Sequence, residues 1–326
     1  MYVPDRIVTN EEISHLVGLS PDHIFKSSGI RQRRWAAKGT RTSQLATAAL
    51  QNAIKDADIA NTDIDYLIMG TMTPDRFIPG TGPTIQHLLG LRQIPCLDIR
   101  AACCNTLYGL QLARSLIASG EARNVALCFA EVQSALLQLT PTAGTTTMLF
   151  GDGASALVVS NETREKRLRF VDLSLSTDGA HVDLLGVRCP GTEFGSVTSH
   201  SPMDHPSDYS ARMDGQAVIV HALRKIIEAC QNLLKRNGLT IDDVRWIVPH
   251  QANANLLKQI ARGLRFESAD RQVILILEDY GNTSSASMGM SLDVLRRSGQ
   301  LKSGDYLLLP AFGAGFTWGA ALCLSE

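Results

Sequence analysis

The alternation of short apolar runs with helical patterns is the feature that most constrains how this chain of 326 residues folds. Strands buried on both faces of a sheet read as nearly continuous apolar runs, and parallel neighbours need a connection that is usually a helix. The pattern therefore predicts an α/β protein. Strands are expected near residues 66–69, 96–99, 125–129, 156–159, 244–248, 273–277, 306–309 and 320–324. Helices are expected near residues 42–57, 83–90, 103–119, 212–236, 252–263 and 284–298.

The two halves of the chain follow one plan. In each half a polar turn follows a strand and opens a helix, and this turn carries Cys103 in the first half and Asn282 in the second. The separation is about 38 residues both from Asp65 to Cys103 and from Val244 to Asn282, which is the regularity that an internal repeat produces. The pattern indicates a duplicated unit.

Cys103 lies where an expected strand gives way to an expected helix. The free amides and the dipole at a helix N-terminus favour an anion, so a fold can lower the pKa of a thiol at this position and produce the reactive thiolate. Position alone leaves a second interpretation open, in which Cys103 and Cys104 are small buried packing residues. Cys104 is also the rival nucleophile, one residue further along the helix.

His250 ends an apolar run, and Asn282 follows another, residues 273–277, after four residues. Taken singly, His250 could be a core histidine with its hydrogen bonds satisfied, and Asn282 could be a turn residue. Together with Cys103 they place a thiol, an imidazole and an amide at the carboxyl ends of strands. Open α/β folds collect their chemistry at that edge.

Six stretches occur in an order and at spacings that identify a family. They are residues 28–33 (SGIRQR), 98–103 (DIRAAC), 150–154 (FGDGA), 249–253 (PHQAN), 281–284 (GNTS) and 311–319 (AFGAGFTWG). On these stretches the chain closely resembles the ketoacyl-acyl carrier protein synthase III branch of the thiolase superfamily. The resemblance implies a thiolase-like fold of five layers, α/β/α/β/α, from two pseudo-duplicated halves. We expect the nucleophile's half at residues 1–165 and the half with the catalytic His and Asn at 166–326.

The resemblance implies a role for each candidate catalytic group. The Cys103 thiolate attacks an acyl thioester and takes the acyl group. The backbone amides of Cys103 and Ala314 form the oxyanion hole that stabilises the tetrahedral intermediate. A malonyl thioester then loses carbon dioxide, and His250 and Asn282 donate hydrogen bonds to the resulting enolate. His250 also helps to ionise the thiol early in the cycle.

Substrate binding and assembly are likewise expectations from the resemblance. Family members are homodimers, and the bulky residue that commonly closes the acyl pocket across the dimer is matched by Ile78. Asn253, Phe312 and Gly313 are the other expected substrate-binding residues. Acyl-coenzyme A, or the phosphopantetheine of an acyl carrier protein, delivers the primer as a substrate.

The chain departs from the family pattern at positions that hold the coenzyme A nucleotide. A tryptophan and two arginines in well-known members are matched by His23, Ser27 and Ala143. Adenine stacking and phosphate pairing should therefore be weaker there. A primer held on carrier protein, or a coenzyme A pocket built differently, is expected. Asn105 also replaces a small residue that usually lies two positions after the nucleophile.

Acidic carrier proteins dock on basic patches, because complementary charge steers association. Arg224, Lys225, Lys258 and Arg262 lie on two expected helices near the His250 motif and are candidate docking residues. The alternative is that they are ordinary solvated charges on helix surfaces.

Composition excludes other classes of function. The formal net charge is -1, whereas nucleic-acid binding needs a basic surface. No apolar run reaches the roughly 18 residues of a spanning helix, and the first residues lack the apolar core of a signal peptide. The seven cysteines show no disulfide framework or zinc-site spacing. His200 and His205, in the long irregular segment 186–213, are expected at the surface. We therefore expect a cytoplasmic protein that has no metal, no permanently bound cofactor and no contact with membrane or nucleic acid.

Three functional hypotheses follow. The first is a decarboxylating condensing enzyme, an acyltransferase that joins an acyl primer to malonyl-acyl carrier protein in fatty acid or related specialised biosynthesis. The second is an enzyme that uses the same Cys103 acyl-enzyme to acylate an alcohol, an amine or a β-keto acid without decarboxylation. The third is a non-catalytic binding protein of thiolase fold. The presence of Cys103, His250 and Asn282 together argues against the third, since binding alone does not require all three.

Overall fold

The computed structural model describes residues 1–162, 167–194, 200–266 and 271–326. One of its two main sheets is built from β3 (Tyr66–Gly70), β4 (Cys96–Ile99), β5 (Asn124–Glu131) and β6 (Gly153–Ser160). The strand order is β4-β3-β5-β6. Strand β3 runs parallel to β4 and β5, whereas β6 runs antiparallel to β5. Two parallel neighbours followed by an antiparallel hairpin therefore make up this sheet.

The second sheet repeats this plan and adds one strand. Its members are β7 (Leu168–Thr177), β10 (Val244–Ile247), β11 (Gln272–Val273), β12 (Tyr306–Gly313) and β13 (Thr317–Ser325). The strand order is β11-β10-β12-β13-β7. Strand β10 is parallel to β11 and β12, and β13 is antiparallel to β12 and β7. The first four positions thus match the first sheet in order and direction.

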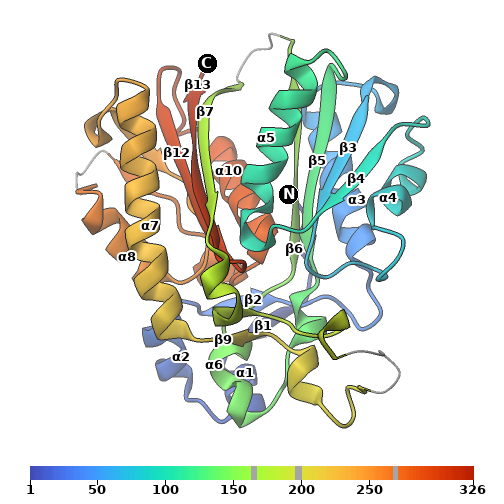
Figure 1. Ribbon diagram of the computed structural model, residues 1–326, viewed down its shortest axis with the longest axis vertical. Coiled ribbons are helices and arrows are strands. Elements are labelled where there is room, and N and C mark those ends of the chain that lie inside the picture. Colours follow the sequence, from blue (N-terminus) through green and yellow to red (C-terminus); the bar gives the residue numbers. More distant parts are fainter. Residues whose placement is uncertain (163–166, 195–199, 267–270) are drawn as a thin grey trace.

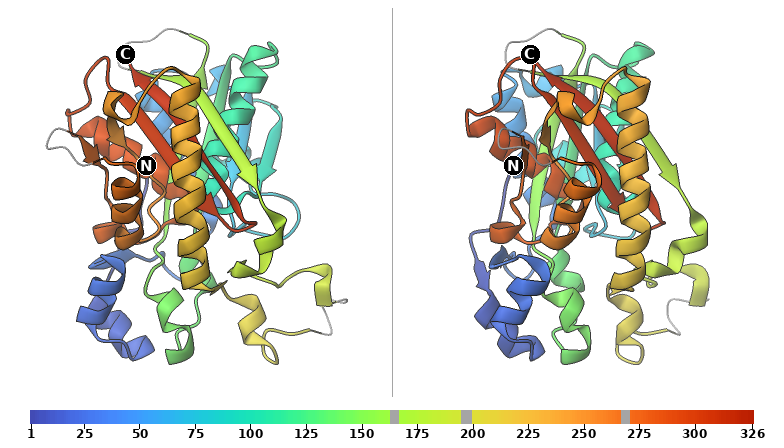
Figure 2. Two further views of the ribbon diagram at one scale, coloured as in Figure 1. Left: turned by 60° about the vertical axis from the view of Figure 1, so that its left-hand side comes forward. Right: turned by 90° about the vertical axis from the view of Figure 1, so that its left-hand side faces the viewer.

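Helices lie outside and between the two sheets, which gives five layers (Figure 1). Helices α3 (Thr42–Asp56) and α4 (Gly82–Leu88) cover the outer face of the first sheet. Helices α5 (Asn105–Ala118) and α10 (Ser287–Arg297) lie between the sheets. Helices α7 (Gly215–Arg236) and α8 (Ala254–Gly263) cover the outer face of the second sheet (Figure 2).

The remaining elements lie at one end of the sheets (Figure 1). They are β1 (Ile7–Thr9), α1 (Asn10–Val17), α2 (Pro21–Ser28), β2 (Gln32–Arg34), α6 (Gly144–Thr147), β8 (Leu185–Gly186), β9 (Arg212–Met213) and α9 (Leu277–Tyr280). Val8, Ile13 and Ile24 from the N-terminal segment share a core with residues of α8 and β12. The N-terminal elements therefore close the end of the molecule at which the strands of the second sheet lead into the His250 segment.

Burial explains why these sequences form these elements. All eight residues of β5 are buried, as expected for a strand between two helix layers. Helix α7 instead buries one face, because its apolar residues recur every three or four positions. The buried residues on that face are Val218, Ala222, Ile226, Ala229, Cys230, Leu233 and Leu234.

The structure confirms most of the expected elements, corrects one strand, and adds elements that the patterns did not predict, among them α1, α2 and β7. The strand expected at 273–277 is wrong beyond Val273, because the Gln251 side chain accepts hydrogen bonds from the amides of Ile276 and Leu277 at 2.9 and 3.2 Å. These amides are unavailable to a neighbouring strand, and α9 begins at Leu277. Strand β7 was not expected from the apolar pattern. The expected boundary between residues 165 and 166 lies outside the described residues.

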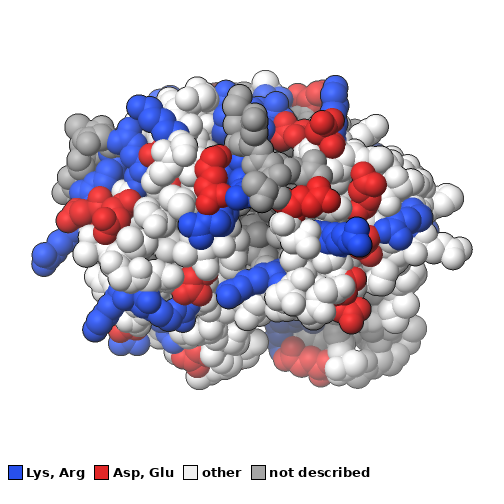
Figure 3. Space-filling model, turned by 90° about the horizontal axis from the view of Figure 1, so that it is seen from above, with Lys and Arg blue, Asp and Glu red and all other residues white. Residues whose placement is uncertain are grey.

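The surface agrees with the near-neutral composition. On the face in Figure 3, basic and acidic side chains are interspersed, so this face carries no extended field of one sign. Among the described helices, none combines the length and the apolar character needed to cross a membrane.

Candidate active site

Cys103 lies in a tight turn between β4 and α5. The turn is a single 3-10 unit, Ala102–Cys104, and Ala102 adopts a φ of 49°. A positive φ is unfavourable for a residue with a side chain, so the surrounding structure must hold this turn in place. The turn brings the Cys103 side chain out of the layer of α5, while Cys104 is fully buried. Burial also raises the pKa of Cys104 well above its ordinary value, which disfavours it as the nucleophile.

The Cys103 sulfur contacts a side chain from the other half of the molecule. Its Sγ lies 3.3 Å from Oγ of Ser284. Burial raises the pKa of Cys103 to about 11, while the contact with Ser284 and the backbone amide of Cys103 act to lower it. The expectation that the helix N-terminus lowers this pKa is therefore wrong for the unliganded protein, because desolvation of the thiolate outweighs the amides.

Gly313 leaves space beside the backbone amide of Cys103. A Cβ atom at Gly313 would lie 2.8 Å from this nitrogen, closer than real Cβ contacts allow. Only glycine therefore fits this position without a shift. Ala314 is the next residue, in the turn between β12 and β13. Phe312 precedes Gly313, is buried, and presents its ring to the edge of the His250 ring at 5.8 Å between centroids.

His250 lies beyond the end of β10 and is 2% exposed. Its backbone N–H donates to the carbonyl of Pro310 at 2.9 Å, which continues the pairing with β12. Its Nδ1 lies 2.8 Å from Oγ of Ser287. Burial lowers the pKa of His250 to about 4, and a hydrogen bond to the Ser284 carbonyl only partly offsets this. The imidazole is therefore neutral at physiological pH.

The orientation of the Asn282 amide is fixed by its neighbours. Oδ1 accepts a hydrogen bond from the Ser284 amide at 2.8 Å, so Nδ2 is the atom that remains to donate. Nδ2 makes only a long contact of 3.5 Å, to the Ala252 carbonyl. The backbone of Asn282 is held on both sides by Leu149 and Gly151, at 2.8 and 3.0 Å. Asn282 is thus a buried, pre-oriented donor.

One segment connects all three groups. Residues 282–287, which we call the catalytic loop, supply Asn282 itself, the hydroxyl of Ser284 at the Cys103 sulfur, and the hydroxyl of Ser287 at His250. The structure therefore brings Cys103, His250 and Asn282 together through neighbours a few residues apart.

Two other expected binding residues lie in different surroundings. Ile78 is 77% exposed in the segment between β3 and α4, and its neighbour Phe77 is 65% exposed. Asn253 caps α8 through Oδ1, which accepts from the amides of Asn255 and Leu256. Its Nδ2 donates to the Ser27 carbonyl at 2.9 Å. Asn253 therefore acts within the fold to join α8 to α2.

The four candidate docking residues differ in how far their side chains are exposed. Lys225 donates to Asp178 at 2.9 Å and lies 4.0 Å from the centroid of the Trp318 ring, with only 11% of its side chain exposed. The Lys225 ammonium is thus already bonded within the fold, and it is poorly placed to bind a carrier protein. Arg224, Lys258 and Arg262 are exposed.

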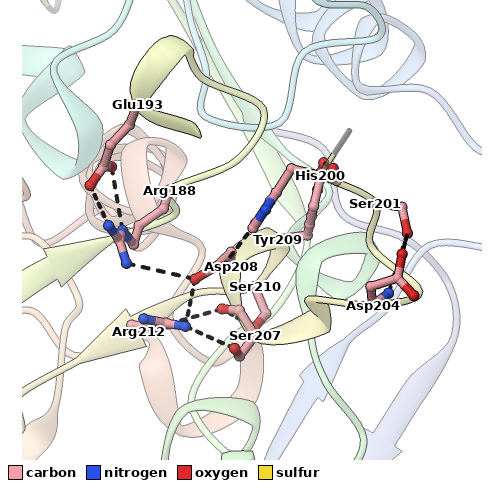
Figure 4. Close-up of polar contacts among 10 residues, drawn as sticks. All are labelled: Arg188, Glu193, His200, Ser201, Asp204, Ser207, Asp208, Tyr209, Ser210 and Arg212. Carbon is pink, nitrogen blue, oxygen red and sulfur yellow. Dashed lines mark hydrogen bonds and ion pairs between the residues drawn. The ribbon is translucent and has the colours of Figure 1, made fainter. Parts of the chain in front are cut away.

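His200 lies in a polar cluster from the described part of segment 186–213 (Figure 4), and the His205 ring stacks on its ring. With Asp208 they offer potential ligand atoms within 4.8 Å of one another. However, the two rings stack 4.0 Å apart at 3°, and a metal ion binds in the plane of each imidazole, which parallel stacked rings do not share. Asp208 accepts from Arg212 at 2.6 Å and from His200 at 3.0 Å. The cluster thus anchors the segment, and His200 is partly buried instead of lying at the surface.

Sequence reasoning missed four polar residues around the site. They are Glu131, Ser284, Ser285 and Ser287, all nearly or fully buried. Glu131 left one signal, as an acidic residue at the end of an otherwise apolar strand. The serines left none beyond the small polar composition of the segment, because a serine in a turn is ordinary.

Comparison with known proteins identifies the family. A model described as 3-Oxoacyl-[acyl-carrier-protein (ACP)] synthase III matches residues 97–179, and its C-terminal counterpart matches residues 234–324. The beta-ketoacyl-[acyl-carrier-protein] synthase III of Rhodospirillum centenum is 37% identical over 323 residues, covering 98% of this chain and 95% of the relative. The chain belongs to the synthase III family. The corresponding protein of Nitratidesulfovibrio vulgaris is 38% identical over 324 residues, covering 98% of this chain and 96% of that relative.

Solved structures of the synthase III family have the same fold. The crystal structure of the enzyme from Aquifex aeolicus matches with a TM-score of 0.88 and 30% identity, over 99% of this chain and 97% of the other. The resemblance drawn from six sequence stretches and the five-layered thiolase-like fold are both confirmed. The two family models cover residues 97–179 and 234–324, so Cys103, His250 and Asn282 all fall within matched regions.

Proposed function

We propose that this protein catalyses the decarboxylating Claisen condensation of an acyl thioester primer with malonyl-acyl carrier protein, through an acyl enzyme on Cys103. The product is a 3-oxoacyl-acyl carrier protein, as formed in fatty acid or related specialised biosynthesis. The observation that carries the proposal is the catalytic loop, which contacts the Cys103 sulfur through Ser284 and the His250 ring through Ser287. Family membership supports the same reaction.

In the first step the Cys103 sulfur attacks the thioester carbonyl of the primer. The thiol is protonated in the free protein, so its proton moves to neutral His250 as the sulfur–carbon bond forms. The amides of Cys103 and Ala314 stabilise the negative charge on the carbonyl oxygen, where a missing donor typically costs about 10²–10³ in rate. The proton then passes to the departing thiolate, which leaves as a free thiol.

In the second step the malonyl carboxylate leaves as carbon dioxide, and the bonding electrons form an enolate. His250 and Asn282 donate to the enolate oxygen. A neutral imidazole suits this role because it carries one ring N–H to donate, and the contact between Nδ1 and Ser287 Oγ at 2.8 Å holds the ring in place. The enolate carbon attacks the acyl carbonyl, and the Cys103 sulfur leaves with the electron pair, which regenerates the enzyme.

The substrates and partners belong to the same proposal. Acyl carrier protein delivers the malonyl group, and the primer arrives on coenzyme A or on carrier protein without any metal or resident cofactor. Arg224, Lys258 and Arg262 are the docking candidates because they are exposed, whereas Lys225 is largely buried. The exposed apolar pair Phe77 and Ile78 supports a homodimer in which Ile78 closes the partner's acyl pocket. A cytoplasmic location follows from this chemistry.

Intact-mass spectrometry after incubation with a panel of acyl thioesters tests the acyl enzyme. We expect one acyl mass on the wild type and none on Cys103→Ala, and the preferred chain identifies the primer. Malonyl-acyl carrier protein should then release carbon dioxide and yield the 3-oxoacyl product. Acyl transfer to other acceptors with no carbon dioxide release would replace the condensation by the second hypothesis.

A further inference from the structure

The catalytic loop must hold its position for the reaction to proceed. Ser284 Oγ lies 3.3 Å from Cys103 Sγ, and Ser287 Oγ lies 2.8 Å from Nδ1 of His250. A shift of the loop would therefore change the geometry of the thiol, the imidazole and the Asn282 amide at once. A displacement of about 1 Å in a catalytic group can cost about 10² in rate.

Besides the backbone bonds of Asn282 and the contact of Ser284 described above, hydrogen bonds of Ser285 tie this loop to the first half of the molecule. The Ser285 hydroxyl donates to Oε1 of Glu131 at 2.5 Å, and its carbonyl accepts from Oγ1 of Thr106 at 3.0 Å. Ser285 is 1% exposed and Glu131 is 0% exposed. Hydroxyl–carboxylate bonds of this kind are short and about twice as strong as bonds between neutral groups. Ser285 is thus an anchor of the loop, and Glu131 is its counterpart at the end of β5.

The remaining partners of Glu131 are also uncharged. Its carboxylate accepts from the Met72 amide at 3.0 Å, and from Thr73 Oγ1, Thr71 Oγ1 and Gln133 Nε2 at 3.1, 3.3 and 3.4 Å. Burial raises the pKa of Glu131 to about 7 despite these bonds. Burying a carboxylate in this way is unfavourable compared with a well-packed apolar side chain. The burial of Glu131 therefore does not itself stabilise the protein. Its contribution must be to fix the positions of the groups to which it is hydrogen-bonded.

Glu131 also acts on the nucleophile electrostatically. Its negative charge raises the pKa of the Cys103 thiol, in the same direction as burial and against the bond from Ser284. Glu131 therefore has two effects on the reaction, and one favours it while the other opposes it. It fixes the loop that the reaction needs, and it makes the thiolate harder to form before substrate arrives.

We propose that Glu131, acting through Ser285, is a positioning residue that holds the catalytic loop against the nucleophile. This inference rests on the proposed role of Cys103 in condensation. Because the charge of Glu131 also acts to raise the pKa of the Cys103 thiol, its removal predicts opposite changes in the rates of alkylation and condensation, which a merely structural role cannot produce.

The test compares Glu131→Gln, Ser285→Ala and the control Ser43→Ala in the full-length protein. One measurement is alkylation of Cys103 by iodoacetamide near about pH 7.5, followed by peptide mass spectrometry. The other is the condensation rate with malonyl-acyl carrier protein. Ser43 is a buried serine on α3 whose hydroxyl has no hydrogen-bond partner in the structure, so its removal matches the loss of a buried hydroxyl elsewhere.

For Glu131→Gln we expect faster alkylation and slower condensation. Loss of the charge should raise the alkylation rate about 3- to 10-fold, because the thiolate fraction follows the thiol pKa. Condensation should fall at least about 10-fold, because the glutamine NH2 faces groups that are themselves donors. Ser285→Ala should slow condensation similarly but leave alkylation near the wild-type rate, since the Glu131 charge remains. Ser43→Ala should match the wild type in both rates.

Several results would overturn the inference. Unchanged rates in Glu131→Gln, or parallel decreases in both rates, would leave only a structural role. Should Glu131→Gln fail to fold, unchanged condensation in Ser285→Ala would be enough to reject the positioning role. The proposed function fails separately: wild-type protein that makes no condensation product would refute it, while the alkylation rates would still report whether Glu131 suppresses the thiol.

Discussion

In the first half of the molecule a 3-10 turn leads from β4 into α5, and in the second half a 3-10 turn leads into α10. The first residue of each turn has a positive φ, 49° at Ala102 and 47° at Ser284. The second residue is Cys103 in one turn and Ser285 in the other. The proposed nucleophile and the proposed loop anchor therefore occupy equivalent positions in two copies of one backbone.

The residue that faces each turn differs. Gly313 is the last residue of β12 and lies against the Cys103 amide, whereas Glu131 is the last residue of β5 and binds Ser285. Both strands have eight residues and the same place in their sheets. Where the strand ends in glycine, its backbone approaches the Cys103 amide closely with no side chain between them. Where it ends in glutamate, the side chain is hydrogen-bonded to the turn. The same scaffold thus leaves one turn without a side-chain partner from the strand end and fixes the other.

The largest test of this comparison is Gly313→Ala. The added methyl group would lie 2.8 Å from the Cys103 amide, so it should displace or block the oxyanion position and reduce acyl-enzyme formation by about 10²–10³. Single-turnover mass spectrometry with the preferred primer measures this rate. Gly186→Ala is the matched control, because a Cβ atom there has open space. An acylation rate in Gly313→Ala equal to that of the control would show that the open turn is not required.

The two halves should also respond to pH with opposite sign. The folded protein holds His250 with a pKa of about 4, below the ordinary 6.5, so the unfolded chain binds more protons between these values and stability falls as pH decreases through them. Glu131 has a pKa of about 7, above the ordinary 4.5, so stability falls as pH rises through that window. Each effect amounts to about 3 kcal/mol at its full extent.

Denaturant unfolding of wild type, His250→Asn and Glu131→Gln from about pH 4.5 to 8 checks this prediction. Relative to wild type, Glu131→Gln should gain stability as pH rises, and His250→Asn should gain stability as pH falls. The prediction is wrong if the free energies of unfolding of the two variants, each relative to wild type, change with pH in the same direction. The free energy of unfolding is the quantity to compare, since both variants are expected to lose activity.

The sequence predicted the parts of this arrangement that depend on pattern. Apolar runs and helical spacing located most of the strands and helices, and the positions of Cys103, His250 and Asn282 at strand ends predicted where they meet. The equivalence of Cys103 with Ser285 could not be predicted, because a one-residue offset within a turn depends on backbone angles. The Lys225–Asp178 pair likewise joins two distant elements, and charge on a helix face does not reveal whether it is already paired.

The direction of the Cys103 pKa shift was not predicted correctly from the sequence. A helix N-terminus was expected to lower it, yet burial and the charge of Glu131 raise it. The sequence identifies the helix that supplies the amides. It does not tell how completely the sulfur loses water, nor that a carboxylate from β5 lies nearby. Desolvation and long-range charge depend on tertiary packing, which a local pattern does not contain.

A smaller effect is expected at the link between the loop and the imidazole. Ser287→Ala removes the hydroxyl at Nδ1 of His250, which also accepts from the Gln251 amide at 3.2 Å. Condensation should fall about 10-fold, because the imidazole loses the side chain that holds its ring in position. Acylation should fall less, so the ratio of the two rates is the measurement. Ser291→Ala, one turn further along α10, removes a buried hydroxyl bonded only to the Ser287 carbonyl and should preserve that ratio.

The smallest expected effect concerns the positive φ that both turns share. Glycine relieves the cost of about 1–2 kcal/mol that a left-handed residue incurs, but it also loses about 0.5–1 kcal/mol through chain entropy. Ala102→Gly should therefore stabilise the protein by roughly 0.5 kcal/mol in denaturant unfolding. Ala118→Gly, at the exposed end of α5, should instead destabilise it. Ser284→Gly should gain less than Ala102→Gly, because it also removes the hydroxyl at the Cys103 sulfur. Equal gains at Ala102 and Ser284 would mean that this hydroxyl contributes nothing to holding the two halves together.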